Sequence, residues 1–205
     1  PRGTPKPERD PLVAVSFAKT HGKGGLITGD EKEILSTLIS EIQEFDPDFL
    51  IGFKTNSFHW PYLLRRSSSI SSPLRIGRNG GEPHQSLFGH FSIAGRISLD
   101  LRDYADDVTA IQRKTLEELA LHVGVELPEE AIDKFYFSEY WADEARRKEL
   151  LKYFSWRARA MLEIFLKISD EIFTISSITG MPMDYVFTAS PAYRLENFLM
   201  RQAVK

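Results

Sequence analysis

The side chains that could support chemistry are concentrated in Asp46–Leu64, which reads DPDFLIGFKTNSFHWPYLL. Lys54 and His59 are its basic side chains, and an imidazole is a common ligand for zinc. A zinc site needs several such ligands, however, and the surrounding sequence adds only Asn56 and His84, without an HxxxH motif or any cysteine. The pattern therefore favours a surface or structural histidine over a metal ligand at His59.

Local patterns place these residues where a strand meets a helix. Asp46-Pro47 ends an amphipathic helix, and Phe49–Gly52 is a short apolar run typical of a buried strand. Asn56 or Ser57 is the predicted N-cap of the next helix, which carries His59. The end of a strand that leads into a helix is a common location for sites in α/β proteins.

The order of the predicted elements is strand, strand, helix, strand, helix, which indicates a mixed α/β fold. Thr28 or Asp30 is the predicted cap of the first helix. A tight-turn signal at Asn79-Gly80-Gly81 predicts a β-hairpin within Leu74–Asp100. The other predicted segments are a buried strand at Leu12–Ala18, a short strand at Leu26–Thr28, a serine-rich loop after Arg66 that runs to Ser72, a strand within Phe91–Leu101, an acidic loop at Asp103–Asp107, a helix through Leu116 and Val123 that ends at Gly124, and one or two helices over Glu139–Ser176 that end at Gly180.

The composition limits the classes of protein to consider. With 205 residues, the chain fits one large domain or a domain with a short extension. A net charge of −3 gives no overall attraction to nucleic acid, so any such binding must come from local patches. The absence of cysteine excludes disulfides and thiolate metal sites, and no apolar run is long enough to predict a membrane span. An intracellular protein of the cytoplasm is expected.

The central stretch resembles the second exonuclease motif of family B DNA polymerases. In that family a strand ending in Ile-Gly-Tyr-Asn is followed by Phe-Asp-Trp-Pro-Tyr-Leu, whereas this chain has Ile-Gly-Phe-Lys and Phe-His-Trp-Pro-Tyr-Leu. Phe58 matches the motif. The metal-binding Asp of the family corresponds to His59, and its Asn corresponds to Lys54.

Further stretches extend the resemblance along nearly the whole chain. The region 74–101 resembles archaeal members in its Leu-X-X-Gly-Arg turn and its Gly-Arg-Ile-X-X-Asp-Leu strand, where Asp100 matches an acidic residue of the family. The third exonuclease motif, Tyr-X-X-X-Asp on a helix, corresponds to Tyr153 and Arg157. Thr188–Lys205 resembles the segment that leads toward the polymerase palm.

The resemblance implies a ribonuclease H-like 3′–5′ exonuclease fold, with a mixed sheet flanked by helices and a β-hairpin insertion. It implies an exonuclease-like domain at residues 1–185 and the start of the connection to the palm at 186–205. The first exonuclease motif, Asp-X-Glu on an opening strand, would precede Pro1, so we expect an internal fragment of a longer DNA polymerase homologue.

The resemblance also implies that the carboxylates needed for two-metal nuclease catalysis are partly replaced in this chain. Two-metal nucleases hold ions about 3.5–4 Å apart with a carboxylate cluster, and Mg²⁺ prefers oxygen ligands. Two of the four family carboxylates correspond to His59 and Arg157, so we predict no metal site and no cofactor for this domain, although active relatives use Mg²⁺. The predicted function is a non-catalytic scaffold and DNA-handling surface in DNA replication or repair. An active nuclease with an altered metal site is the least favoured interpretation.

Two hypotheses remain for the basic residues. Lys54, His59 and Arg157 could form a cationic pocket for single-stranded DNA, or Arg157 could pair with a remaining acidic residue such as Asp100, which is the simpler outcome. Arg75 and Arg78, in the predicted hairpin, are further candidates for DNA contact. The expected partners are single-stranded or primer-template DNA, the polymerase domain of the parent chain and other replication proteins, in the nucleoid and away from membranes. A module that docks a replication protein without binding DNA is the alternative.

Overall fold

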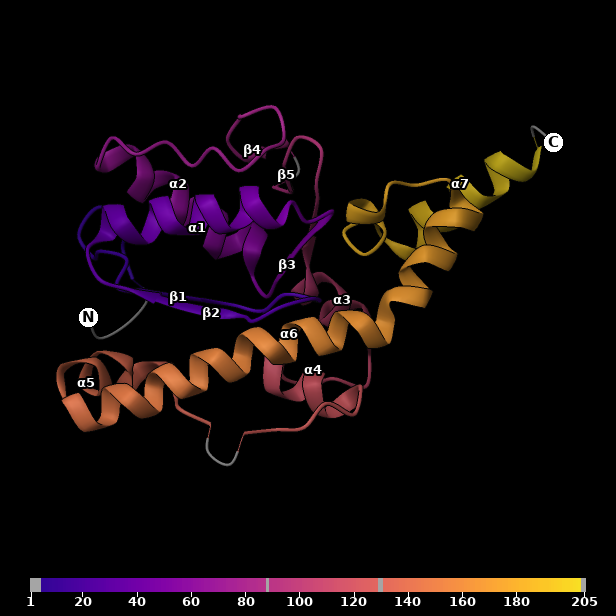
Figure 1. Cartoon of the computed structure of the whole chain (residues 1–205). Coiled ribbons are helices and arrows are strands. Elements are labelled where there is room, and N and C mark those ends of the chain that lie inside the picture. Colours follow the sequence, from indigo (N-terminus) through magenta and orange to yellow (C-terminus); the bar gives the residue numbers. More distant parts are fainter. Residues whose placement is uncertain (1–4, 88, 129–130, 204–205) are drawn as a thin grey trace.

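The computed structural model describes residues 5–87, 89–128 and 131–203, which form a mixed α/β structure (Figure 1). Its elements are β1 (Ala14–Phe17), β2 (Gly25–Thr28), α1 (Glu31–Phe45), β3 (Phe49–Gly52), the π-helical turn η1 (Thr55–His59), α2 (Trp60–Ser69), β4 (His84–Gln85), β5 (Phe91–Ser92), β6 (Ile97–Asp100), α3 (Leu101–Asp107), α4 (Leu116–His122), the 3₁₀ turn η2 (Lys134–Tyr136), α5 (Phe137–Ala142), α6 (Glu144–Thr179), the 3₁₀ turn η3 (Met183–Tyr185) and α7 (Pro191–Ala203). None of the helices described is long and apolar enough to cross a membrane.

The strands pair in three two-stranded sheets, which include both parallel and antiparallel pairs. β1 and β2 are antiparallel, as are β4 and β5, whereas β3 and β6 are parallel. In the parallel pair Gly52 lies opposite Asp100, so the two strands end side by side. The mixed α/β prediction is confirmed, although the described strands form separate small sheets rather than one.

Helix α6 is the longest element, with 36 residues, and extends about 54 Å at 1.5 Å per residue. It packs against the β1–β2 pair, and α1 contacts the same pair, which lies between the two helices in Figure 1. Asp143 caps α6 by accepting backbone N–H groups of Ala145 and Arg146, and Gly180 ends it in a left-handed conformation with φ +74°. The predicted long helical region and its end at Gly180 are confirmed, with α5 as the separate first helix.

The core consists of two apolar clusters on either side of β3. The first includes Phe53, Leu99 and Ile164 and gathers against α6. The second includes Leu35 of α1 and Trp60 of α2. The Trp60 indole N–H donates to Ser98 Oγ at 3.0 Å, which joins α2 to β6. The C-terminal end of β3 is therefore held firmly from both sides.

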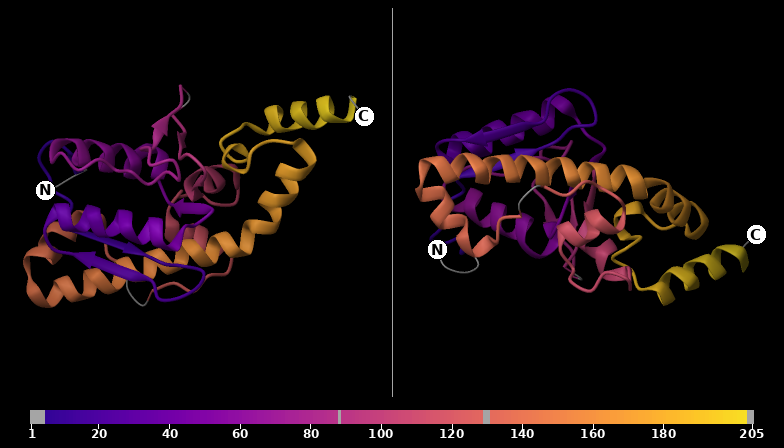
Figure 2. Two further views of the ribbon diagram at one scale, coloured as in Figure 1. Left: turned by 45° about the horizontal axis from the view of Figure 1, so that its top comes forward. Right: turned by 90° about the horizontal axis from the view of Figure 1, so that it is seen from below.

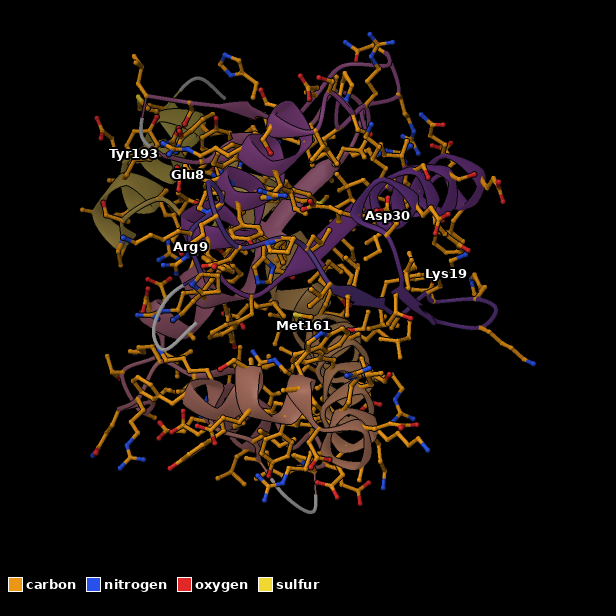
Figure 3. All side chains as sticks on the ribbon, turned by 90° about the vertical axis from the view of Figure 1, so that its left-hand side faces the viewer. Glu8, Arg9, Lys19, Asp30, Met161 and Tyr193 are labelled. Carbon is orange, nitrogen blue, oxygen red and sulfur yellow. The ribbon has the colours of Figure 1, made fainter. Side chains whose placement is uncertain are left out.

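The predicted helix ends are partly confirmed. Asp30 caps α1 by accepting the backbone N–H of Lys32 at 2.9 Å, and Figure 3 shows Asp30 at the start of that helix. The predicted N-cap at Asn56 or Ser57 is wrong, because α2 is preceded by the π-helical turn η1 and has no side-chain cap. The prediction of a loop after Arg66 is also wrong in its first part: α2 continues through Ser69, and the hydroxyls of Ser67 and Ser69 donate to carbonyls three residues earlier.

Three other predicted segments differ from the structure. The predicted β-hairpin within Leu74–Asp100 is confirmed by the antiparallel pair β4–β5, but it does not form across Asn79-Gly80-Gly81. Gly80 makes a turn there with φ +75°, but the paired strands β4 and β5 come later in the chain. The strand at Leu12–Ala18 shortens to β1 and is only half-buried, because the two-stranded β1–β2 ribbon leaves it partly open to solvent. The acidic segment Asp103–Asp107 belongs to α3 and is not a loop.

Candidate functional site

Asp100 organises the junction at the end of β3 and β6. Its Oδ1 accepts the backbone N–H groups of Lys54 at 2.7 Å and Arg102 at 3.0 Å, and its Oδ2 accepts that of Asn56 at 2.9 Å. The residue is only 5% exposed. The predicted structural, capping role of Asp100 is confirmed, since it caps α3 and also fixes the turn that carries Lys54.

The backbone at this turn is unusual, because Lys54 has φ +64°. A non-glycine residue in the left-handed region costs about 1–3 kcal/mol and persists only where the surroundings hold it. The Asp100 carboxylate supplies that restraint. The ammonium of Lys54 is left exposed to solvent, where it can contact an anion.

Gly52 allows the chain to fold back over the end of β3. A Cβ atom at this position would lie 2.3 Å from Thr55 Cγ2 and 3.9 Å from His59 Nδ1. His59 therefore sits above the strand end, next to the turn that Asp100 holds.

We expect Gly52→Ala to lower the free energy of unfolding by about 1–2 kcal/mol, because the added methyl group overpacks the turn against Thr55. Adding Thr55→Ser, which removes the clashing methyl group, should restore most of the loss. Urea unfolding of the single and double variants measures both effects. Equal stability of Gly52→Ala and the unchanged chain would show that the turn relaxes freely.

Arg157 approaches the site from α6 and is held by Glu117 of α4. Its Nη1 lies 2.6 Å from Glu117 Oε1, and the hydroxyl of Tyr153 donates to the same oxygen at 2.7 Å. Arg157 thus pairs with an acidic residue, but the suggested partner Asp100 is wrong. Backbone N–H groups already occupy the Asp100 oxygens, whereas α4 packs directly against α6.

The aromatic ring of Tyr153 packs against the guanidinium of this ion pair. Its ring centroid is 5.7 Å from the guanidinium carbon of Arg157, and the ring stacks on Trp156 at 5.8 Å. Burial of the phenol, then its hydrogen bond to Glu117, raises the pKa of Tyr153 to about 12. The hydroxyl therefore stays protonated and remains a donor to Glu117.

Lys54, His59 and Arg157 share one electrostatic environment. The surrounding protein, then the positive charges of Arg157 and Lys54, lower the pKa of His59 to about 4. Solvent also reaches the His59 side chain, and its lowered pKa leaves His59 neutral at pH 7. Arg157 and Lys54 then supply the positive charge of this group.

Asp103 lies beside Asp100 on α3 and was not singled out in the sequence. Burial, then the charge of Asp100, raises the pKa of Asp103 to about 6. Hydrogen bonds from Asn56 Nδ2 at 3.2 Å and Thr188 Oγ1 at 3.1 Å act in the opposite direction. Asn56 therefore links two carboxylates to the turn, and Thr188 ties the segment after η3 to α3.

The arrangement matches a known domain family. The family described as DNA polymerase family B, exonuclease domain, matches residues 4–119. The chain belongs to that family. It is 33% identical to DNA polymerase 2 of Aeropyrum pernix over 98% of this chain and 26% of that protein, and 28% identical to a DNA polymerase of Archaeoglobus fulgidus over 99% and 26%.

A solved structure shows the same fold. The family B DNA polymerase from Pyrobaculum calidifontis superposes with a TM-score of 0.94 at 35% identity, over 99% of this chain and 27% of that one. The predicted ribonuclease H-like exonuclease fold is therefore confirmed. The chain spans about a quarter of the length of these relatives.

The family resemblance implies Mg²⁺ at this position, but the residues of this family B chain do not fit that ion. A guanidinium repels a divalent cation, and the Asp100 oxygens are already occupied by backbone N–H groups. Across the part of the chain that the structure describes, no group of three or more His, Asp or Glu side chains could hold a metal ion.

The other candidates lie apart from this group. Arg78 bridges Asp46 and Asp48 at 2.8 Å each, at the opposite end of β3 from Lys54. Arg75 is exposed near the same end. Phe58 packs its ring against Tyr62 at 5.4 Å between centroids, within the motif turn. The charges of Lys54 and Arg157 thus both act on His59, whereas Arg75 and Arg78 lie elsewhere.

Proposed function

We propose that this chain is a non-catalytic exonuclease-like domain that serves as a scaffold and holds single-stranded DNA without cutting it. The observation that carries the proposal is the position of Arg157. Its guanidinium is paired with Glu117 at 2.6 Å, and the motif resemblance aligns it with a metal-binding carboxylate of the family. A fixed cation disfavours two-metal catalysis and favours contact with phosphate oxygens.

The relatives support a place in DNA replication or repair, since their names describe DNA polymerases. We propose that residues 1–185 form the exonuclease-like domain and that 186–205 begin the connection toward a polymerase palm. The partners would then be single-stranded or primer-template DNA and the polymerase domain, in the nucleoid of the cell. Helix α7 fits a connecting role because it lies at one end of the molecule, beside the last turns of α6, in both views of Figure 2.

We expect labelled single-stranded DNA to bind this chain at low salt, to dissociate as salt rises, and to stay full-length with Mg²⁺ or Mn²⁺ present. Anisotropy at two salt concentrations, followed by a gel of the same samples, measures both properties. Lys54→Gln should weaken binding about threefold and flatten the salt dependence, because a phosphate contact is lost. The matched control is Lys32→Gln, which removes an exposed charge on α1. Shortened DNA would contradict the proposal.

The alternative function is docking of a replication protein without DNA binding. It is favoured by apolar side chains on α7, where Leu195 and Leu199 are 57% and 56% exposed. Tyr193, labelled in Figure 3, lies on the same helix and is 52% exposed. The absence of DNA binding even at low salt would favour this alternative over the first proposal.

A further inference from the structure

Glu117 has no counterpart among the motif residues noted in the sequence, yet it controls the charge of the site. It lies in the first turn of α4, and its Oε1 accepts from both Arg157 and Tyr153. Its side chain is 25% exposed and that of Arg157 is 29% exposed. An incoming ligand can therefore reach the ion pair without unfolding either helix.

A carboxylate and a phosphate compete for the same donors of a guanidinium. Both present oxygen acceptors that an arginine can grip through two parallel N–H groups. While Glu117 holds Nη1, that donor is unavailable to DNA. Because His59 is neutral at pH 7, the group of Lys54, Arg157 and Glu117 carries one net positive charge, and it would carry two without the glutamate.

We infer that Glu117 is an internal competitor for DNA phosphate, which masks Arg157 and holds the affinity of this site for single-stranded DNA low. The inference rests on the proposed function and adds its regulation. A phosphate that takes Nη1 displaces the carboxylate of Glu117 from Arg157, whereas Tyr153 can keep its hydrogen bond to Glu117. Anything that draws Glu117 away would strengthen binding at the same site.

The test compares variants of the 205-residue chain by anisotropy with labelled oligothymidine at several salt concentrations. Glu117→Gln should bind about threefold to tenfold more tightly at low salt, because the competing ion pair is removed. Its plot of log affinity against log salt should steepen by about 0.7, the value for one more phosphate contact on a single strand. Glu117→Ala also removes the carboxylate and should show the same gain in affinity and the same change in salt dependence as Glu117→Gln.

Matched variants separate this effect from a change in net charge. Glu163→Gln removes the same charge from an exposed position on α6 and should leave the affinity nearly unchanged. Combining Glu117→Gln with Arg157→Ala should abolish the gain, because no guanidinium remains to be unmasked. Circular dichroism and thermal unfolding establish that each variant is folded.

The outcomes distinguish the inference from the function on which it rests. Suppose that the unchanged chain binds DNA in a salt-dependent way, but neither Glu117→Gln nor Glu117→Ala binds more tightly than Glu163→Gln. The masking of Arg157 by Glu117 is then overturned, and the proposed function stays in place. Binding by Glu117→Gln and Glu117→Ala, but not by the unchanged chain or Glu163→Gln, supports the masking of Arg157 and contradicts the expected binding of DNA by the unchanged chain. The absence of binding by every folded variant overturns both. If the gain in DNA affinity persists when Glu117→Gln is combined with Arg157→Ala, the masking of Arg157 is also overturned, because the added phosphate contact would then not come from Arg157.

Discussion

Asp100→Ala is expected to lower the free energy of unfolding by about 3–4 kcal/mol. The Asp100 carboxylate accepts three backbone N–H groups, those of Lys54, Asn56 and Arg102, and is 5% exposed. A buried donor left without a partner costs about 1–3 kcal/mol, and a lost helix cap costs about 1 kcal/mol. Relief of the repulsion between Asp100 and Asp103 offsets part of this loss.

Urea unfolding measures the change, with Asp106→Ala as its control. Asp106 lies on α3 but is exposed and pairs with Arg102 at the surface, so its loss should change stability by less than about 0.5 kcal/mol. Asp100→Ala should also weaken DNA binding, because the left-handed turn at Lys54 loses its restraint. If the two alanine variants prove equally stable, Asp100 does not hold the junction.

Asp103→Asn is expected to stabilise the protein at pH 7 and to leave it nearly unchanged near pH 4. The pKa of Asp103 rises from 3.8 to about 6 on folding, chiefly through burial. A raised carboxyl pKa means that the folded state binds the proton more tightly than the unfolded state. The stabilisation that protonated Asp103 gives the folded state is therefore fully present below pH 3.8 and is lost as pH rises through about 6.

A pKa shift of this size corresponds to a gain of at most about 3 kcal/mol in the unfolding free energy of Asp103→Asn at neutral pH. We expect about 1–2 kcal/mol, because Asp103 is partly exposed. Asparagine can accept the same bonds from Asn56 and Thr188 without a charge. Unfolding by urea at pH 4.5 and pH 7.5 compares Asp103→Asn with Asp106→Asn. A stability difference between these variants that is the same at both pH values would mean that Asp103 titrates normally.

Local signals identified most of the elements around the site. The apolar run at Phe49–Gly52 predicts β3 with its observed limits, and Asp30 caps α1 as its position indicates. Gly180 ends α6 because glycine adopts the left-handed conformation easily. Signals of this kind depend on neighbouring residues only, so they can be recognised without knowledge of the fold.

The errors arose where a distant residue overrides the local preference. Asn56 resembles a helix cap, but its side chain donates to Asp103 and accepts the backbone N–H of Phe91. The acidic segment after Asp100 resembles a loop, yet α3 forms there because Tyr104 packs into the core. In both cases tertiary contacts decided the local conformation.

The sequence by itself determined the family and the strand and helix that frame the site. The motif resemblance predicts that His59 and Arg157 stand in place of two motif carboxylates. Only the tertiary structure decided what Arg157 binds. Glu117 lies 40 residues earlier in the chain and reaches Arg157 because α4 packs on α6. Charge pairing depends on distance in space, and no local pattern specifies which of the 29 acidic residues will face a given arginine.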